Sequence, residues 1–151
     1  MEKMIDDGLL HTLTTQAATE GIQRLIVGAV VPCDAGVLLL KRPEGDFMGG
    51  IFELPSGKVE HGESLTEALA REVHEESGLI VTDIRGYLGS FDYISGSGKK
   101  SRQFNFAVNV DRTEPVELSE HDAFLWAAPT GDLPVTDSVE RIIQAYRRTF
   151  S

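Results

Sequence analysis

Short apolar runs separated by turn residues predict a protein built largely on strands. Runs of this kind, which are typical of buried strands, lie at 25–31, 37–40, 51–54 and 124–128. In 102–110, phenylalanine and valine alternate with other residues at the two-residue period of a strand. This segment is predicted to form a hairpin with 85–94 around the glycine-rich turn at 95–98.

One helix interrupts these strands and a second follows them. Residues 64–77 are predicted to be helical, because Ser64 and Glu67 form a capping-box pair and Gly78 lies where a helix usually ends. Residues 138–149 carry apolar residues at helical spacing. Strands around a central helix, with another helix at the end, predict a mixed α/β or α+β sandwich.

The N-terminal segment, residues 1–20, is less clearly patterned. Its apolar residues fall on one face of a short predicted helix: Leu9, Leu10, Leu13 and Ala17. We expect an extension that is either part of the fold or a dimer interface. Residues 21–151 contain no internal repeat and no linker long enough to divide them, so a single domain is expected there.

Composition narrows the class of protein and its location. The 151 residues include 24 acidic and 14 basic side chains, a formal net charge of -10. A general nucleic-acid binder or a polybasic membrane-surface protein needs a basic face, so neither is expected. Cys33 is the only cysteine, which excludes an internal disulfide and favours a reducing compartment. No apolar run is long enough to span a membrane and no signal-peptide pattern appears, so we expect a cytoplasmic protein.

The predicted helix at 64–77 is unusually acidic near its C-terminal end. At helical spacing, Leu65, Leu69, Glu72 and Glu76 fall on one face, which is predicted to face the core. The first half of this face is apolar and the second half carries carboxylates. Glu72, Glu75 and Glu76 repel one another at these spacings and oppose the helix dipole. A hard divalent cation, Mg²⁺ or Mn²⁺, would resolve the conflict, whereas a solvated acidic face is the simpler alternative.

Arg71 adds a second feature to the same helix. Its guanidinium is predicted to fork onto a carboxylate from the preceding loop, and Glu63 is the nearest candidate. The alternative is an ordinary surface salt bridge, which would stabilise the protein little.

The segment 57–79 resembles the signature of the Nudix hydrolase family. Every fixed position of that signature is matched, by Gly57, Glu63, Arg71, Glu72, Val73, Glu75, Glu76, Gly78 and Leu79. The resemblance implies a Nudix-type α/β/α sandwich with a mixed β-sheet. It also implies an enzyme that hydrolyses a nucleoside diphosphate linked to another group X, with Mg²⁺ or Mn²⁺ as cofactor.

The resemblance also implies roles for individual residues of the motif. Glu72 and Glu76 are expected to be the main metal ligands, and Glu75 either a further ligand or the group that activates water. Glu63 and Arg71 are expected to tie the loop to the helix, and Glu63 also to reach the metal. Catalysis is therefore assigned to these helix residues, Arg71 included.

Further candidates lie outside the acidic helix. The backbone carbonyl of Ser56 is implied to be a metal ligand, although the family often has glycine there and serine would be strained if the position required a positive φ. Glu120 and Asp111 are candidates for a catalytic carboxylate outside the motif, of which we favour Glu120. The alternative for each is an ordinary acidic loop residue.

Candidate substrate-binding residues are a few basic, aromatic and amide side chains: Arg42, Phe52, Lys58, Arg102 and Asn105. The basic side chains would meet phosphate, Phe52 would stack on a base and Asn105 would read a base edge. The alternatives are surface solubility for the basic residues, core packing for the aromatic ring and structural hydrogen bonding for the amide.

The reaction favoured by the resemblance converts a (deoxy)nucleoside triphosphate into the monophosphate and pyrophosphate. Metal ions would let a protein of this net charge bind an anionic nucleotide. Hydrolysis of ADP-ribose or a nucleotide sugar is the alternative within the family. A nucleotide-binding regulator without turnover and a plain structural domain are the alternatives outside it. We expect a nucleotide as partner, no nucleic acid and no membrane, with a homodimer as an option.

Overall fold

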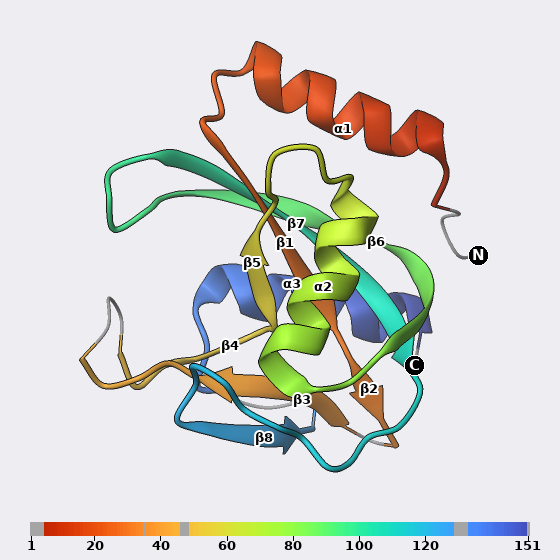
Figure 1. Cartoon of the computed structure of the whole chain (residues 1–151), viewed down its shortest axis with the longest axis vertical. Coiled ribbons are helices and arrows are strands. Elements are labelled where there is room, and N and C mark those ends of the chain that lie inside the picture. The colour runs from red at the N-terminus through yellow and green to blue at the C-terminus, as the bar shows by residue number, and fades with distance from the viewer. Residues whose placement is uncertain (1–4, 35, 46–48, 129–132, 151) are drawn as a thin grey trace.

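The computed structural model describes residues 5–34, 36–45, 49–128 and 133–150, and Figure 1 shows how its elements are arranged. The helices are α1 (Asp7–Thr19), α2 (Leu65–Ser77) and α3 (Asp137–Phe150). The strands are β1 (Arg24–Val30), β2 (Pro32–Cys33), β3 (Gly36–Lys41), β4 (Phe52–Glu53), β5 (Ser56–Lys58), β6 (Val81–Ile94), β7 (Lys100–Val110) and β8 (Ala123–Ala127). None of the described helices is long and apolar enough to cross a membrane.

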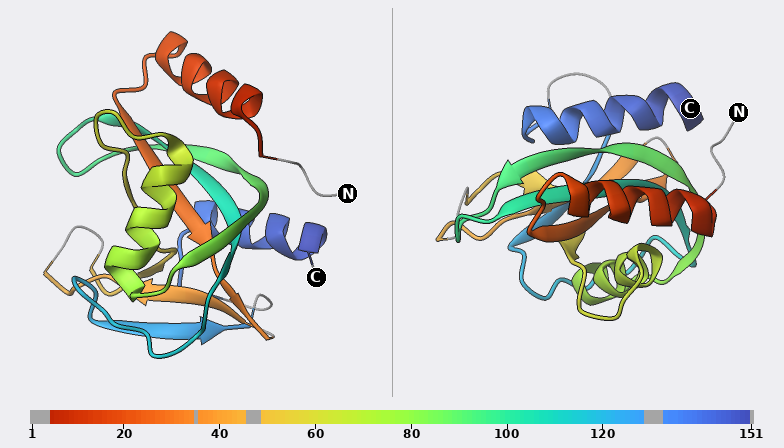
Figure 2. Two further views of the ribbon diagram at one scale, coloured as in Figure 1. Left: turned by 45° about the vertical axis from the view of Figure 1, so that its right-hand side comes forward. Right: turned by 90° about the horizontal axis from the view of Figure 1, so that it is seen from above.

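The strands form two sheets. The first has the order β5-β1-β7-β6, in which β1 and β7 run parallel and the other neighbours antiparallel. In the second, β3 pairs antiparallel with β2, β4 and β8. Helices α2 and α3 cover opposite faces of the first sheet, as Figure 2 shows from above. The predicted α/β/α sandwich with a mixed sheet is therefore confirmed.

A hydrophobic cluster fills each side of the first sheet. On one side, α1 and α2 pack against the sheet, with Leu13, Leu69 and Phe104 among the buried residues. On the other side, α3 packs against the two sheets, with Ile143 and Leu39 in the cluster. The N-terminal segment thus contributes to the core through the buried face of α1.

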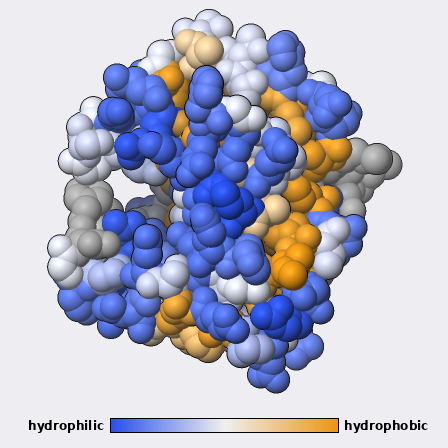
Figure 3. All heavy atoms as spheres, viewed as in Figure 1, coloured by the Kyte–Doolittle hydropathy of each residue, from blue (hydrophilic) through white to orange (hydrophobic). Residues whose placement is uncertain are grey.

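Helix α2 begins and ends where its sequence predicts. The Ser64 hydroxyl accepts a hydrogen bond from the Glu67 N–H at 3.1 Å, and the Glu67 carboxylate accepts one from the Ser64 N–H at 2.9 Å. Gly78 ends the helix in the left-handed conformation, with φ 77°. The face of α2 turned to solvent is largely hydrophilic (Figure 3), so the buried stripe is what fixes the helix on the sheet.

Two features differ from the predicted elements. The strand β5, Ser56–Lys58, has no counterpart among them, because three residues that include a glycine carry no strand period. The hairpin is longer than predicted, since β6 begins at Val81. The turn residues between the predicted strands at 25–31, 37–40 and 51–54 include Ala35 and residues 46–48, and these four lie outside the described part of the chain.

Candidate active site

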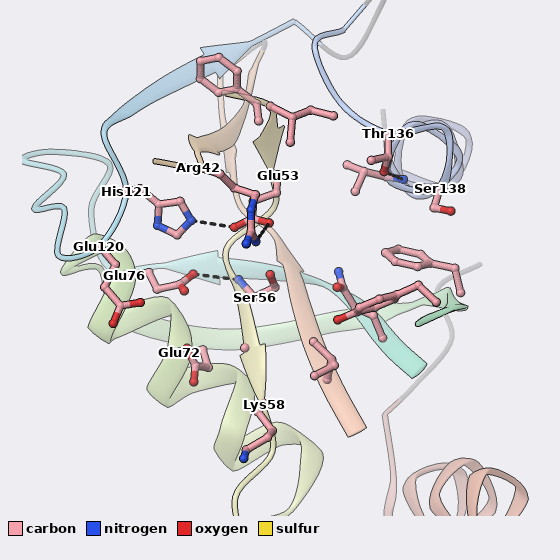
Figure 4. A pocket seen from close by; sticks show the side chains of 18 of the residues that line it. Arg42, Glu53, Ser56, Lys58, Glu72, Glu76, Glu120, His121, Thr136 and Ser138 are labelled. Atoms are coloured by element: carbon pink, nitrogen blue, oxygen red, sulfur yellow. Dashed lines mark hydrogen bonds and ion pairs between the residues drawn. The ribbon is translucent and has the colours of Figure 1, made fainter. Parts of the chain in front are cut away.

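A pocket of about 530 Å³ opens between α2, strand β5 and the start of α3. Figure 4 shows two unlike sides. Carboxylates from α2 and the β7–β8 connection gather on one side: Glu72, Glu76 and Glu120. The hydroxyl side chains of Thr136 and Ser138 lie toward the other. The aromatic side chains of Phe91 and Tyr93 also line the pocket, from β6, which is the opposite outer strand of the sheet from β5. One side is therefore suited to cations and the other to a partly apolar group.

Glu76 is held at the pocket by strand β5. Its Oε1 accepts a hydrogen bond from the Ser56 N–H at 2.9 Å, and the residue is only 9% exposed. Burial raises the pKa of Glu76 to about 8, and the hydrogen bond from Ser56 and the charge of His121 offset this only in part. The anionic form of Glu76 is therefore poorly compensated by the protein alone.

Glu72 lies one helical turn before Glu76 and approaches strand β5 closely. A Cβ placed on Gly57 would overlap the Glu72 carboxyl group, so the absence of a side chain at position 57 makes this approach possible. Burial raises the pKa of Glu72 as well, and the hydrogen bond from Arg71 opposes the shift. Two carboxylates with unfavourable anionic forms thus stand side by side.

Arg71 binds three carboxylates and a carbonyl. Its Nε and Nη2 fork onto Glu63 at 2.7 and 2.8 Å, and its Nη1 reaches Glu72 at 2.7 Å and Glu75 at 2.8 Å. Its Nη2 also donates to the carbonyl of Lys58 at 3.0 Å. The hydrogen bond from Arg71 lowers the pKa of Glu63 to about 2. The predicted fork between Arg71 and Glu63 is confirmed, and it orients Glu72.

A second polar group lies across the pocket from α2 (Figure 4). Glu53 accepts hydrogen bonds from Arg42 Nη1 at 3.1 Å and from His121 Nε2 at 2.8 Å. Burial lowers the pKa of His121, but the bond to Glu53 and the charges of Glu76 and Glu53 outweigh it, so the pKa is raised. His121 Nδ1 is buried with no hydrogen-bond partner among the described residues.

The structure brings some predicted site residues to this pocket and places others elsewhere. Those that line it are Arg42, Phe52, Ser56, Lys58, Glu72, Glu76 and Glu120. Arg71, Glu63 and Glu75 do not line it; they form the ion-pair cluster behind Glu72. Ser56 carries no strain of the kind considered above, because Asp34 is the only non-glycine residue with a positive φ in the described part of the chain.

Two predicted substrate contacts are placed away from the pocket lining, which corrects the sequence analysis. Arg102 binds Asp92 at 2.7 Å and Glu20 at 2.6 Å, so its charge is already paired by exposed acids of β6 and the end of α1. Asn105 is fully buried and bonded within the sheet. Asp111 is also removed from the pocket, since it accepts the Ile80 N–H at 3.1 Å.

Sequence reasoning missed several polar pocket residues, among them Glu53, His121 and Gln103. Glu53 and His121 meet only because β4 and the loop before β8 both flank β3. Gln103 lies on the face of β7 opposite to that of Phe104 and Phe106, and the apolar alternation of this strand identifies only the phenylalanine face. A polar residue at a buried strand position was the available signal for Gln103.

The carboxylate side of the pocket fits a divalent cation. The donor set is oxygen only, and burial raises the pKa of Glu72 and Glu76, so a cation at these carboxylates would stabilise their anionic forms. Among the described residues, no three His, Cys, Asp or Glu side chains converge closely enough to enclose an ion. Mg²⁺ usually takes one or two protein carboxylates and completes its shell with water and phosphate, so two suffice.

Comparison with known proteins agrees with this geometry. A family model described as the NUDIX domain matches residues 22–146. The CTP pyrophosphohydrolase of Escherichia coli (strain K12) is 33% identical over 104 residues, which are 69% of this chain and 75% of that protein. The 8-oxo-dGTP diphosphatase of Proteus vulgaris is 42% identical over 62 residues, 40% of this chain and 55% of that protein.

Solved structures give the same result. The MutT protein from Methanosarcina mazei Go1 superposes with a TM-score of 0.72 at 27% identity, covering 83% of this chain and 93% of that one. The motif on α2, the sandwich around it and these similarities coincide along the chain. This protein therefore belongs to the Nudix hydrolase family, and it is an enzyme of that family.

Proposed function

We propose that this protein hydrolyses a (deoxy)nucleoside triphosphate to the monophosphate and pyrophosphate, with Mg²⁺ or Mn²⁺ as cofactor. The observation that carries the proposal is one pocket with carboxylates on one side, hydroxyl and aromatic groups toward the other, and the basic side chains of Arg42 and Lys58 in the same lining. This order fits a molecule with a polyphosphate at one end and a base at the other. The proposed metal ligands are the side chains of Glu72 and Glu76 and the carbonyl of Ser56.

The backbone of strand β5 supports the third ligand. In an antiparallel pair, the N–H and C=O groups of one residue point to the same side of the strand. The Ser56 N–H reaches Glu76 rather than β1, so the Ser56 carbonyl also faces the outer edge, beside α2. A bound divalent cation supplies charge neutralisation at the phosphates and lowers the pKa of bound water.

The remaining residues hold the reacting groups in place. Arg71 forms an ion pair with Glu72 and so fixes the orientation of its carboxylate. The ion pairs of Arg71 with Glu63 and Glu75 hold the arginine in position. Lys58 lines the pocket on strand β5, where its ammonium is suited to a phosphate oxygen.

Glu120 is proposed to accept a proton from the attacking water. It lines the pocket near Glu72 and has no hydrogen bond or ion pair among the described residues, so its carboxylate is available to water. Glu75 is the alternative on the helix, but it is bonded to Arg71 and does not line the pocket. The geometry therefore favours Glu120 over Glu75 for this step.

The choice of triphosphate over other nucleotides rests on similarity. The Escherichia coli relative named above is a CTP pyrophosphohydrolase and the Proteus vulgaris one an 8-oxo-dGTP diphosphatase. An ADP-ribose pyrophosphatase of Methanocaldococcus jannaschii is 42% identical over 65 residues, 43% of this chain and 37% of that protein. Hydrolysis of ADP-ribose is therefore the second candidate. A cytoplasmic location and a homodimer stay predictions.

The test is product analysis. The protein is incubated with Mg²⁺ and nucleoside triphosphates, ADP-ribose and nucleotide sugars in turn, and the products are separated by chromatography. We expect a monophosphate and pyrophosphate from a triphosphate, abolished by Glu76→Gln and retained in Glu117→Gln, which changes an exposed glutamate outside the pocket lining. Turnover of ADP-ribose or a sugar nucleotide alone would establish the second candidate, and no turnover of any compound would contradict both.

A further inference from the structure

The floor of the pocket is a row of side chains that crosses the first sheet. The strand registers place Lys58, Ile26, Gln103 and Phe91 opposite one another, on β5, β1, β7 and β6 in turn. All four line the pocket. Lys58 stands at the carboxylate end and Phe91 at the aromatic end, so Gln103 lies beside the ring on which a base would stack.

The next row of the same face contains a buried amide whose orientation is fixed by carbonyls. Asn105 Nδ2 donates to the carbonyl of Gly89 at 3.1 Å and to the carbonyl of Gln103 at 3.1 Å. Carbonyl oxygens only accept hydrogen bonds, so the NH₂ group of Asn105 must point to them. Its Oδ1 therefore points the other way, as an acceptor.

This acceptor fixes the orientation of Gln103. Gln103 Nε2 donates to Asn105 Oδ1 at 2.8 Å. A flipped Gln103 amide would place two oxygens in contact, so the oxygen of Gln103 must point away from Asn105. In the described part of the chain Gln103 Oε1 has no hydrogen-bond partner, and it is not among the fully buried polar atoms. Gln103 Oε1 thus presents a hydrogen-bond acceptor to the pocket, and the amide cannot flip to place its NH₂ group there instead.

Gly28 allows the two amides to lie together. A Cβ on Gly28 would stand 2.5 Å from both Asn105 Oδ1 and Gln103 Nε2, closer than any real side chain tolerates. The pair of amides therefore depends on a glycine in the adjacent strand, β1. A buried polar pair between apolar strands costs free energy unless its groups are satisfied, and in the described part of the chain the Gln103 oxygen has no hydrogen-bond partner.

We propose that Gln103 reads the base of the nucleotide and selects bases that present an exocyclic amino group, with Asn105 as the residue that positions it. This inference rests on the proposed function. An acceptor held in place favours the amino group of cytosine or adenine over the carbonyl of uracil or hypoxanthine at the same ring position. The wrong base leaves two oxygens facing each other, without a hydrogen bond between them.

The experiment compares matched nucleotides that differ in this group alone. The kcat/KM values are measured with Mg²⁺ for CTP against UTP and for ATP against ITP. We expect the amino-bearing member to be preferred by about tenfold in each pair, the size of one hydrogen bond gained or lost. Dissociation constants of CMP and UMP, measured by calorimetry without metal, give a readout that does not need turnover.

Two variants separate recognition of the base by Gln103 from a loss of stability. Gln103→Met keeps the length and removes the acceptor, so the CTP/UTP ratio is expected to fall toward one through loss of CTP turnover. Asn105→Leu frees the Gln103 amide to turn, so the ratio is expected to fall through a gain of UTP turnover. A change in stability alone would not lower CTP turnover in one variant and raise UTP turnover in the other.

The outcomes distinguish this inference from the proposed function. Hydrolysis of triphosphates with a CTP/UTP ratio near one, unchanged by Gln103→Met, would overturn the inference and leave the proposed function standing. Absence of triphosphate hydrolysis, with CMP bound more tightly than UMP and the difference erased by Gln103→Met, would support the inference and overturn the proposed function. Should Asn105→Leu fail to fold, Gln103→Met and the binding data decide the question.

Discussion

Two arginines of this protein gather carboxylates, and only one of them belongs to the site. Arg71 on α2 binds Glu63, Glu72 and Glu75, and its side chain is 25% exposed. Arg102 on β7 binds Asp92 and Glu20, and its side chain is 13% exposed. The bond lengths are alike, since the shortest contact of each lies at 2.6 to 2.7 Å. The strength of pairing therefore does not tell the two clusters apart.

What differs is where the partners lie. Glu72 lines the pocket, so the Arg71 cluster fixes the position of a group that faces the substrate. Asp92 and Glu20 do not line it; they join β6 and the C-terminal end of α1 to β7. An arginine that collects acids acts on chemistry only through the acid that it turns toward the reacting groups.

The largest expected effect concerns Glu76, which stands beside the Arg71 cluster without belonging to it. Glu76→Gln keeps an acceptor for the Ser56 N–H and removes the charge, so turnover is expected to fall by about 10²–10³-fold, the loss typical of a removed charge-stabilising group. Steady-state kinetics with the preferred nucleotide measure it. Unchanged kcat in a folded Glu76→Gln protein would refute the site.

The second effect sharpens the comparison at Arg71. Arg71→Lys keeps the charge but cannot bond Glu63, Glu72 and Glu75 at once, so Glu72 loses its orientation. We expect a loss of about 10–100-fold in metal affinity or activity, as for other groups that orient metal ligands. Titration with Mn²⁺ followed by electron paramagnetic resonance measures the affinity. Equal affinity in Arg71→Lys and the parent protein would break the distinction between the clusters.

A third effect is the pH dependence of stability without metal. The folded-state pKa of Glu76 is raised from 4.5 to about 8, so the folded protein holds a proton that the unfolded chain has released. The free energy of unfolding is therefore expected to fall as pH rises from about 4.5 to about 8. Melting curves in chelator measure it, with Glu76→Gln as the control that flattens the profile. A metal-free stability that rises across this window in the parent protein would contradict the burial of an uncompensated carboxylate.

The Arg71 cluster has the opposite dependence through Glu63. Its pKa is lowered from 4.5 to about 2, so the stabilisation that it contributes is complete above 4.5 and is lost as pH falls toward 2. Glu63→Gln is expected to reduce the acid-induced loss of stability relative to the parent, since a neutral side chain has no proton to gain. The same melting curves, extended to acid, test this.

The smallest effect is expected at the second arginine. Arg102→Met is expected to leave kcat and KM unchanged and to lower the free energy of unfolding by about 1 kcal/mol, as for pairs with exposed acids. The melting temperature would fall by about 2–4 °C. Nucleotide turnover and a melting curve on one preparation suffice. A clear rise in KM would return Arg102 to the substrate-binding residues.

The features that the sequence predicted are those determined by residues close together in the chain. Ser64 and Glu67 mark the start of helix α2 and Gly78 marks its end. A continuous apolar run marks β1, and apolar residues at helical spacing mark α3. The fork between Arg71 and Glu63 was predictable because one motif spaces both residues. Such features depend on neighbours within one or two turns of the chain.

The parts that escaped prediction depend on distant segments. Strand β5 exists because β1 offers it hydrogen bonds, and nothing in Ser56–Lys58 itself requires a strand. Arg102 and Asn105 have residue types suited to a nucleotide, but their partners Glu20 and Gly89 are brought to them by the tertiary fold. The chemistry of a side chain was readable from the sequence, whereas the direction it faces was not.

The hydrogen bond between Ser56 and Glu76 has a consequence for the solubility of the protein. Among the described strands, β5 is an outer strand of its sheet with β1 as its one neighbour, and the Ser56 N–H points away from β1. A bare amide on an outer strand invites a strand from another molecule and begins aggregation. Glu76 covers that amide, so a single carboxylate serves the site and blocks self-association at this edge. Replacement of Glu76 by alanine would impair the site and also leave the Ser56 amide uncovered. Replacement by glutamine would impair the site but still cover the amide.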